Sequence, residues 1–371
     1  MTHQPVAWKM VTAPDLKSVD LMIKGAYSVA VVCMINPTTV LVWQAFHTVD
    51  DDTSSTVKEP TLQTPCNAAP TQRTVHGTTV QDASVHLGNA DASATGGTPF
   101  TVQVADGTYD LVATTKETDP ATHKTLIQRN VMVSGDTTLP GTIDVSTGVA
   151  QVALGVVLSS PPNPAKSTET VAATVDVTTK NNKGSATVSS ADYNLTNKTI
   201  KIFALPNSAL MSGDTQTATF TGTNNIKDTS ITTSRSITRP FSIGDAVATG
   251  MTSFALPAAI ANPDWGMDKS RLSVALPTLP ALDDLTVKTS GKTADGQTTV
   301  QYEIDITASY FQRTALARPV FDTDIPGFQP SWKIDFVHQA YSRQITSERD
   351  VFSKGAFVDH EESSFFEDVT P

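Results

Sequence analysis

The feature that most restricts the fold of this chain is a series of short apolar runs typical of β-strands. Apolar residues almost nowhere recur with the period of a helix. Residues 98–145 show this best, because PFTVQVADGTYDLVATT and TLIQRNVMV read as short strands separated by turns. Gly107-Thr108-Tyr109 opens one strand, Gly135-Asp136-Thr137 closes another, and Asp106-Gly107 is a tight-turn dipeptide. We therefore predict an all-β chain of tandem antiparallel β-sandwich domains with little helix.

The length of 371 residues allows two or three domains of roughly 100–200 residues each. The stretch SSPPNPAKSTET contains three prolines and no large apolar residue, which is typical of a linker. The last segment mixes Phe with acidic residues, and we expect a mobile or docked tail there. The predicted units are an N-terminal β unit (1–69), a β-sandwich (70–159), a linker (160–170), a C-terminal β domain (171–350) and an acidic tail (351–371).

Charge and hydropathy exclude two classes of partner. The chain carries 26 Lys and Arg against 37 Asp and Glu, a net charge of −11. That balance argues against nucleic acid and against an anionic membrane surface. No apolar run reaches the roughly 18 residues of a membrane span, so we expect no transmembrane segment.

The two cysteines indicate a compartment. Cys33 lies in an apolar strand-like run and Cys66 in a Pro/Thr loop. An even number of cysteines in a Thr-rich, lysine-poor β chain predicts one structural disulfide, formed in an oxidising compartment. The alternative is two unpaired cysteines. A bridge of this kind would stabilise the fold by about 3–4 kcal/mol in the chain-entropy model. We expect an extracellular or periplasmic protein, whose signal is not evident in this chain and would be removed or lie upstream.

One segment carries a family resemblance. PFTVQVADGTYDLVATT and NVMVSGDTTLPGTIDV combine a Gly-x-Tyr-x-Leu-x-Ala strand with an outgoing strand near Gly-Asp. Through these residues the segment 74–158 resembles the carboxypeptidase regulatory-like, or prealbumin-like, domains of bacterial surface proteins. YSVAVVC with Cys66, and FDTDIPGFQPSWKIDF, look like uncharacterised exported proteins of Gram-negative bacteria. The resemblance implies a β-sandwich and a cell-envelope setting, and it carries over no catalytic residues.

Two groups of residues are candidates for a ligand site. Asp322 and Asp324 place two carboxylates two residues apart before a Pro-Gly turn, which suits calcium, although most acidic loops are solvated turns. Trp265 and Trp332 lie near turns, with Phe328 close to Trp332 in the sequence, and exposed aromatic rings stack on sugars. The alternative is that each tryptophan fills the edge of a sandwich core.

A catalytic interpretation is weaker. Glu303, Asp305 and Asp335 lie in predicted strands and are the candidates for a pair of carboxylates in a glycoside hydrolase. Alternation places Glu303 and Asp305 on one face, which is more often the wet side of a sandwich.

We therefore predict a non-catalytic exported envelope or surface protein that acts as scaffold, self-assembly or adhesion module. Its partners would be other envelope proteins or further copies of itself. The alternatives are carbohydrate binding and, less favoured, glycoside hydrolysis. We expect no cofactor, with calcium as the alternative.

Overall fold

The computed structural model shows an all-β chain whose strands form several sheets. It describes residues 26–48, 71–116, 122–159, 169–182, 184–194, 198–226, 229, 231–243, 248–249, 253–257, 284–307, 329, 341–352 and 358–369. Two single-turn 3₁₀ helices, η1 (Val145–Thr147) and η2 (Asn207–Ala209), interrupt the strands. Within these ranges, no helix has the length and apolarity that crossing a membrane requires.

The first sandwich packs a five-stranded sheet, of order β10-β8-β7-β4-β5, against a three-stranded sheet, of order β6-β3-β9. The inward side chains of both sheets form one core, and polar residues alternate with them along β4 and β6. The strands are β3 (Gln72–Thr78), β4 (Ala83–Leu87), β5 (Ala90–Ala94), β6 (Pro99–Ala105), β7 (Gly107–Thr115), β8 (Lys124–Val133), β9 (Thr137–Thr138) and β10 (Val149–Ala150).

The turn at Asp106-Gly107 is a corner between the two sheets. The sequence predicts a tight turn here, and the structure has one, but β6 pairs with β3 whereas β7 pairs with β4 and β8. The Tyr109 hydroxyl donates to the Ala105 carbonyl across the corner at 2.8 Å. A Cβ atom on Gly107 would lie 3.0 Å from the Tyr109 ring, so the corner is tight against this side chain.

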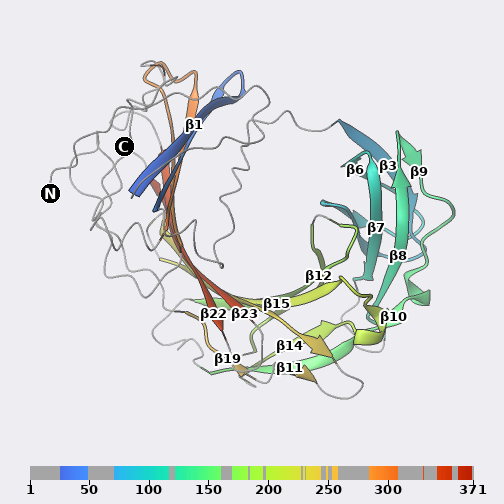
Figure 1. Cartoon of the computed structure of the whole chain (residues 1–371). Coiled ribbons are helices and arrows are strands. Elements are labelled where there is room, and N and C mark those ends of the chain that lie inside the picture. Colours follow the sequence, from blue (N-terminus) through green and yellow to red (C-terminus); the bar gives the residue numbers. More distant parts are fainter. Residues whose placement is uncertain are drawn as a thin grey trace.

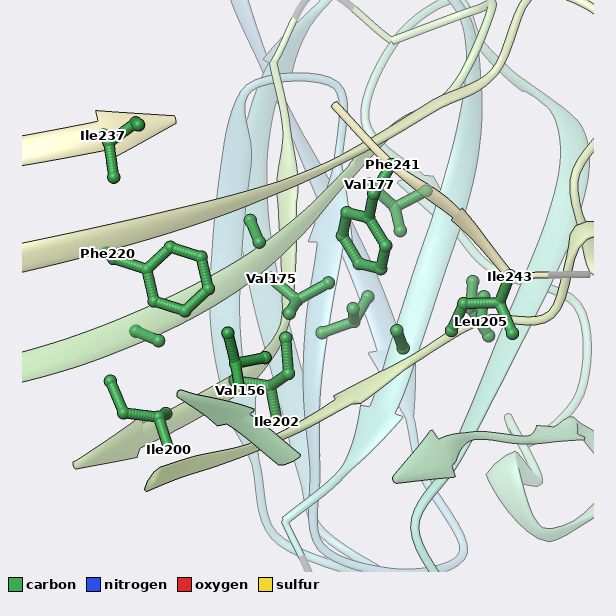
Figure 2. Close-up of a cluster of buried hydrophobic side chains, with 14 of the residues drawn as sticks. Val156, Val175, Val177, Ile200, Ile202, Leu205, Phe220, Ile237, Phe241 and Ile243 are labelled. Atoms are coloured by element: carbon green, nitrogen blue, oxygen red, sulfur yellow. The ribbon is translucent and has the colours of Figure 1, made fainter. Parts of the chain in front are cut away.

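The second sandwich packs β12, β13, β15 and β16 against a three-stranded sheet of order β14-β11-β19. Figure 2 shows Phe220, Val175 and Ile237 on one side of this core and Val156, Ile200 and Ile202 on the other. Burying each such large apolar side chain stabilises the fold by about 1.5–3 kcal/mol. The strands are β11 (Val152–Leu158), β12 (Thr170–Thr178), β13 (Ala186–Asp192), β14 (Thr199–Ala204), β15 (Thr215–Asn225), β16 (Ile231–Pro240) and β19 (Ser253–Phe254). A separate pair is formed by β17 (Ser242–Ile243) and β18 (Ala248–Thr249).

One ten-stranded sheet joins the second sandwich to both ends of the described chain. Its order is β1-β2-β21-β20-β22-β23-β16-β15-β12-β13, and it curves from β1 to β12 in Figure 1. The remaining strands are β1 (Ala26–Asn36), β2 (Thr39–Thr48), β20 (Asp284–Lys292), β21 (Thr299–Thr307), β22 (Tyr341–Phe352) and β23 (Val358–Val369). Most pairs are antiparallel, but β2 runs parallel to β21, and the acidic tail enters the sheet as β23 between β22 and β16.

The face of β12, β15 and β16 that points away from the second core is rich in hydroxyl groups. Phe220 and Ala218 of β15 are buried in that core, whereas the alternate residues of the strand are threonines. Thr219 and Thr238 lie opposite each other on β15 and β16, with 2.8 Å between their Oγ1 atoms. Strict alternation along β15 therefore gives one apolar face and one hydroxyl face.

Two short turns close hairpins of the ten-stranded sheet. Asn36-Pro37 connects β1 and β2, and the Asn36 carboxamide oxygen accepts from the Thr38 N–H at 2.9 Å. The segment 294–297 connects β20 and β21, with Gly296 at φ 69°. A positive φ favours glycine because it has no Cβ.

Candidate functional site

The two sandwiches meet along the outer face of the five-stranded sheet. Val112 of β7 is 2% exposed and belongs to the core of the second sandwich, and Ile127 of β8 packs against that core. The last six residues of β7 are all buried, because both faces of the strand are covered. The first sandwich is thus joined to the second by shared apolar packing.

A buried ion-pair cluster, which we call the clamp, connects the two sandwiches at the same interface, which we call the joint. Arg129 of β8 donates from Nη1 to Asp110 Oδ2 at 2.9 Å and from Nη2 to Asp214 Oδ2 at 2.6 Å. The side chains of the two aspartates are 1% and 0% exposed. Asn182 of the second sandwich accepts from the Asp110 N–H and donates to the Asp110 carbonyl oxygen, at 2.9 and 2.8 Å. The clamp therefore links side chains from both sandwiches.

A β-bulge aims the arginine at its partners. Tyr109 pairs with Val131 and Leu111 with Gln128, so that Arg129 and Asn130 together oppose Asp110. Asn130 has a φ of 58°, a left-handed conformation that asparagine tolerates better than most residues. The extra residue turns the strand locally and lets Arg129 reach across the joint.

The clamp favours the charged form of its carboxyl groups. Burial by itself raises the pKa of Asp110, but hydrogen bonds from Asn181, the Asn130 N–H and Arg129 outweigh it and hold the pKa below its ordinary value. Burial likewise opposes ionisation of Asp214, and hydrogen bonds from Arg129 and two backbone N–H groups lower its pKa. Both aspartates are therefore anionic at neutral pH, with the arginine between them.

A second polar contact covers the edge of the ten-stranded sheet. The Val188 carbonyl oxygen of β13 accepts from His123 Nε2 at 3.0 Å and from Gln151 Nε2 at 3.2 Å. The register of β13 shifts beside this residue, and the His123 ring stacks on Phe203 with centroids 4.7 Å apart. Bulged and covered in this way, β13 is a poor template for a further strand.

A cleft of about 650 Å³ opens between the outer face of β4 and β7 and the edge of β13. Its volume lies within the usual range for small-molecule sites, about 300–1,000 Å³. Most lining side chains are hydroxyl-bearing, amide or small residues, with two histidines and one residue of each charge. The lining residues are Ser84, Val85, His86, Asn89, Asp91, Val112, Thr114, Thr115, Lys116, His123, Gly184, Ser185, Ala186, Thr187, Val188, Ser189, Ser190 and Phe203.

His86 is half-buried in the cleft. Burial lowers its pKa, and this outweighs the Gly88 carbonyl, which lies 3.0 Å from Nε2, and the nearby Asp91. The imidazole is therefore neutral at pH 7. The Gly88 carbonyl also accepts from the Gly184 N–H at 3.2 Å, which ties the β4–β5 turn to the second sandwich.

Most of the site residues predicted from the sequence lie outside the part of the chain that the structure describes. Cys33 is half-buried on β1, whereas Cys66, Trp265, Trp332, Phe328, Asp322, Asp324 and Asp335 lie outside the described residues. The disulfide, the calcium loop and the aromatic sugar site therefore stay predictions.

Glu303 and Asp305 share one face of β21, as alternation predicts. Asp305 accepts from Trp43 Nε1 at 2.7 Å and from Thr286 Oγ1 at 2.8 Å. Glu303 lies 3.1 Å from Lys288 Nζ. Trp43 is thus hydrogen-bonded across the parallel β2–β21 pair, so its contacts join the N-terminal hairpin to the sheet.

Sequence reasoning missed the clamp and the cleft. A signal for the clamp was present, since Asp110 interrupts the apolar run YDLVA, where an unpaired carboxylate would be costly to bury. Its partner Arg129 is 19 residues away on another predicted strand and forms no motif with it, and Asp214 lies in a different predicted unit, so spacing could not reveal the cluster.

Neither metal ligation nor similarity points to an established activity. Across the described ranges, no group of three or more His, Cys, Asp or Glu side chains is placed to hold a metal ion. We find no match to this chain among protein-family models, curated proteins or solved structures.

Proposed function

We propose that the chain is a non-catalytic, exported protein of the cell envelope or surface, which acts as a scaffold, self-assembly or adhesion module. The observation that carries this proposal is the joint between the sandwiches. Val112 packs into the second core while Arg129 bridges Asp110 and Asp214, so the two sandwiches form one rigid unit. Rigid placement of a small β module suits presentation of a surface to a partner.

The outer edge of the first sandwich is where a partner strand would add. β6 contains no charged residue and pairs with β3, and no second strand of the described chain pairs with it. An uncharged edge strand of this length is a template for β-augmentation by an extended segment. Further copies of the chain or other envelope proteins would supply that segment.

A charge placed on the edge tests the proposal. Gln103 is exposed on β6, and Gln103→Lys should weaken association, because charged side chains on edge strands oppose strand addition. The matched control is Thr138→Lys on β9, at the opposite edge of the same sheet. Sedimentation of the purified protein and cross-linking on intact cells are the measurements.

We expect wild type and Thr138→Lys to form assemblies or to capture envelope proteins, and Gln103→Lys to do so less. A wild-type protein that stays monomeric and captures nothing on cells would refute the assembly role. Recovery of the protein in the cytosolic fraction would refute the compartment.

A further inference from the structure

We propose that the cleft between the two sandwiches binds a neutral, polyhydroxylated ligand, namely the end of an oligosaccharide. This inference rests on the proposed adhesion function and names the chemical class that it recognises. The inference uses the described lining of the cleft alone, because the aromatic and calcium positions that the sequence suggests lie outside the described residues.

The lining supplies the groups that recognise hydroxyls. A hydroxyl side chain both donates and accepts hydrogen bonds, and so does each hydroxyl of a sugar. Ser84 and Ser190 are exposed on opposite walls, which makes them accessible to a ligand seated between β4 and β13. Ser185 and Thr187 are exposed as well, and Thr187 donates to Asp176. The hydroxyl groups of the other lining residues, Thr114, Thr115 and Ser189, are buried and hydrogen-bonded within the protein.

The cleft has no excess of positive charge. Asp91 and Lys116 are the acidic and the basic residue among its described lining, and Asp176, which accepts from Thr187, adds a second carboxylate beside it. The lowered pKa of His86 leaves the imidazole uncharged at neutral pH. A phosphate, sulfate or uronate would gain little here over a neutral ligand, because strong anion sites use charge-assisted hydrogen bonds from several cations or N–H groups.

The apolar residues of the cleft are buried beneath its polar groups. Val112, Ala186 and Phe203 are 2%, 2% and 8% exposed, so a ligand would be held mainly by the polar side chains above them. The clamp holds both walls before the ligand arrives, which lowers the ordering cost of binding.

A peptide strand is a poorer fit than a saccharide. It would have to add to β13, but that strand is bulged, and its Val188 carbonyl already accepts from His123 and Gln151. An added strand would break these contacts. A small polar ligand can occupy the cleft and leave them in place.

Filling the cleft tests this inference. Ser84 points outward from β4, so Ser84→Tyr should occupy the space of the ligand. Thr101→Tyr places the same ring on the outer face of β6, in the other sheet of the sandwich, and is the matched control. Calorimetry on the full chain would use neutral disaccharides and oligosaccharides of glucose, galactose, mannose and N-acetylglucosamine. Oligogalacturonate and inorganic phosphate serve as the charged ligands for comparison, which we call the charged arm.

We expect saturable binding of at least one neutral saccharide, weakened about tenfold or more by Ser84→Tyr, which corresponds to ~1.4 kcal/mol, and unchanged in Thr101→Tyr. Asp91→Ala, an exposed change at the cleft, should also weaken binding, and it replaces Ser84→Tyr if that variant does not fold. No saturation by any neutral saccharide, equal binding by Ser84→Tyr, or preference for the charged arm would overturn the inference.

The outcome can be separated from the assembly test. If no saccharide binds but the wild-type protein assembles and Gln103→Lys does not, the ligand class is wrong and the scaffold role stands. If a saccharide binds but the protein does not assemble, the scaffold role is wrong and the ligand class stands.

Discussion

Two arginine–aspartate ion pairs in the first sandwich have similar geometry but differ in burial, and this difference decides what each pair contributes to the fold. Arg73 and Asp106 form a two-pronged pair at 2.9 Å for each bond, with side chains 35% and 50% exposed. Arg129 and Asp110 approach equally closely, but their side chains are 17% and 1% exposed. The first pair joins the end of β3 to a corner, whereas the second joins two sandwiches.

The two pairs differ in how much hydration their charged groups lose when the chain folds. Water solvates Arg73 and Asp106 well in the unfolded chain and partly in the folded one, so their net contribution is small. Asp110 and Asp214 have lost their water, and they depend on Arg129 and on neighbouring amides to stay charged. The buried pair therefore fixes one arrangement of the two sandwiches, because any other arrangement leaves a carboxylate without its partner.

Removing the arginine of the clamp should have the largest effect. Arg129→Ala leaves two buried carboxylates without a cation, and we expect a loss of about 3–5 kcal/mol in the free energy of unfolding. Urea unfolding followed by circular dichroism measures it. Small-angle scattering should show a wider distribution of shapes, since the joint loses a link. A loss below ~1 kcal/mol would show that the buried clamp behaves like a surface pair.

Acid should weaken the clamp next. Asp110 and Asp214 have pKa values below those of the unfolded chain, so their stabilising contribution is complete above the ordinary aspartate pKa of about 3.9. It is lost as the pH falls through the lower folded values. In Arg129→Ala burial should instead raise these pKa values, so the stability gap between variant and wild type should narrow from pH 7 towards pH 3. A gap that stays constant over this range would contradict the assigned role of the arginine.

The exposed pair should give the smallest effect. Arg73→Ala should lower the free energy of unfolding only slightly, because water solvates both partners, and raising the salt concentration should reduce that loss further, because exposed charges are screened. The effect of Arg129→Ala should depend much less on salt. Chemical denaturation in urea at low and high sodium chloride concentration measures both, and equal salt dependence would remove the distinction between the two pairs.

Local patterns predict the strands well and their pairing poorly. Alternation in ASVHL and PFTVQV indicates β4 and β6, because side chains of period two have one buried face. The same patterns do not reveal that β6 and β7 belong to different sheets, or that β11 pairs with β14 beyond the predicted linker. Pairing depends on contacts between distant segments, which spacing does not encode.

The candidate site was beyond the reach of sequence reasoning for a related reason. Ser84, His86 and Thr187 form no motif, and each resembles the outward residue of any sandwich strand. They become a cleft because the first sandwich docks beside β13. The predicted tail shows the same effect, since its mixture of Phe and acidic residues indicates neither a central strand nor the neighbours β22 and β16 that it acquires.

The ten-stranded sheet, which takes strands from near both ends of the chain, also sets the order in which the protein can form. Strands β3 to β10 have their own core, built from segments close in sequence, so this core can form during synthesis, before the clamp is complete. The large sheet needs contacts such as that between Trp43 and Asp305, 262 residues apart, and its inner strand β23 is made after the other described strands. Such long-range pairing is slow. Until β23 arrives, β16 and β22 expose open edges, and a cell would have to protect these edges from aggregation.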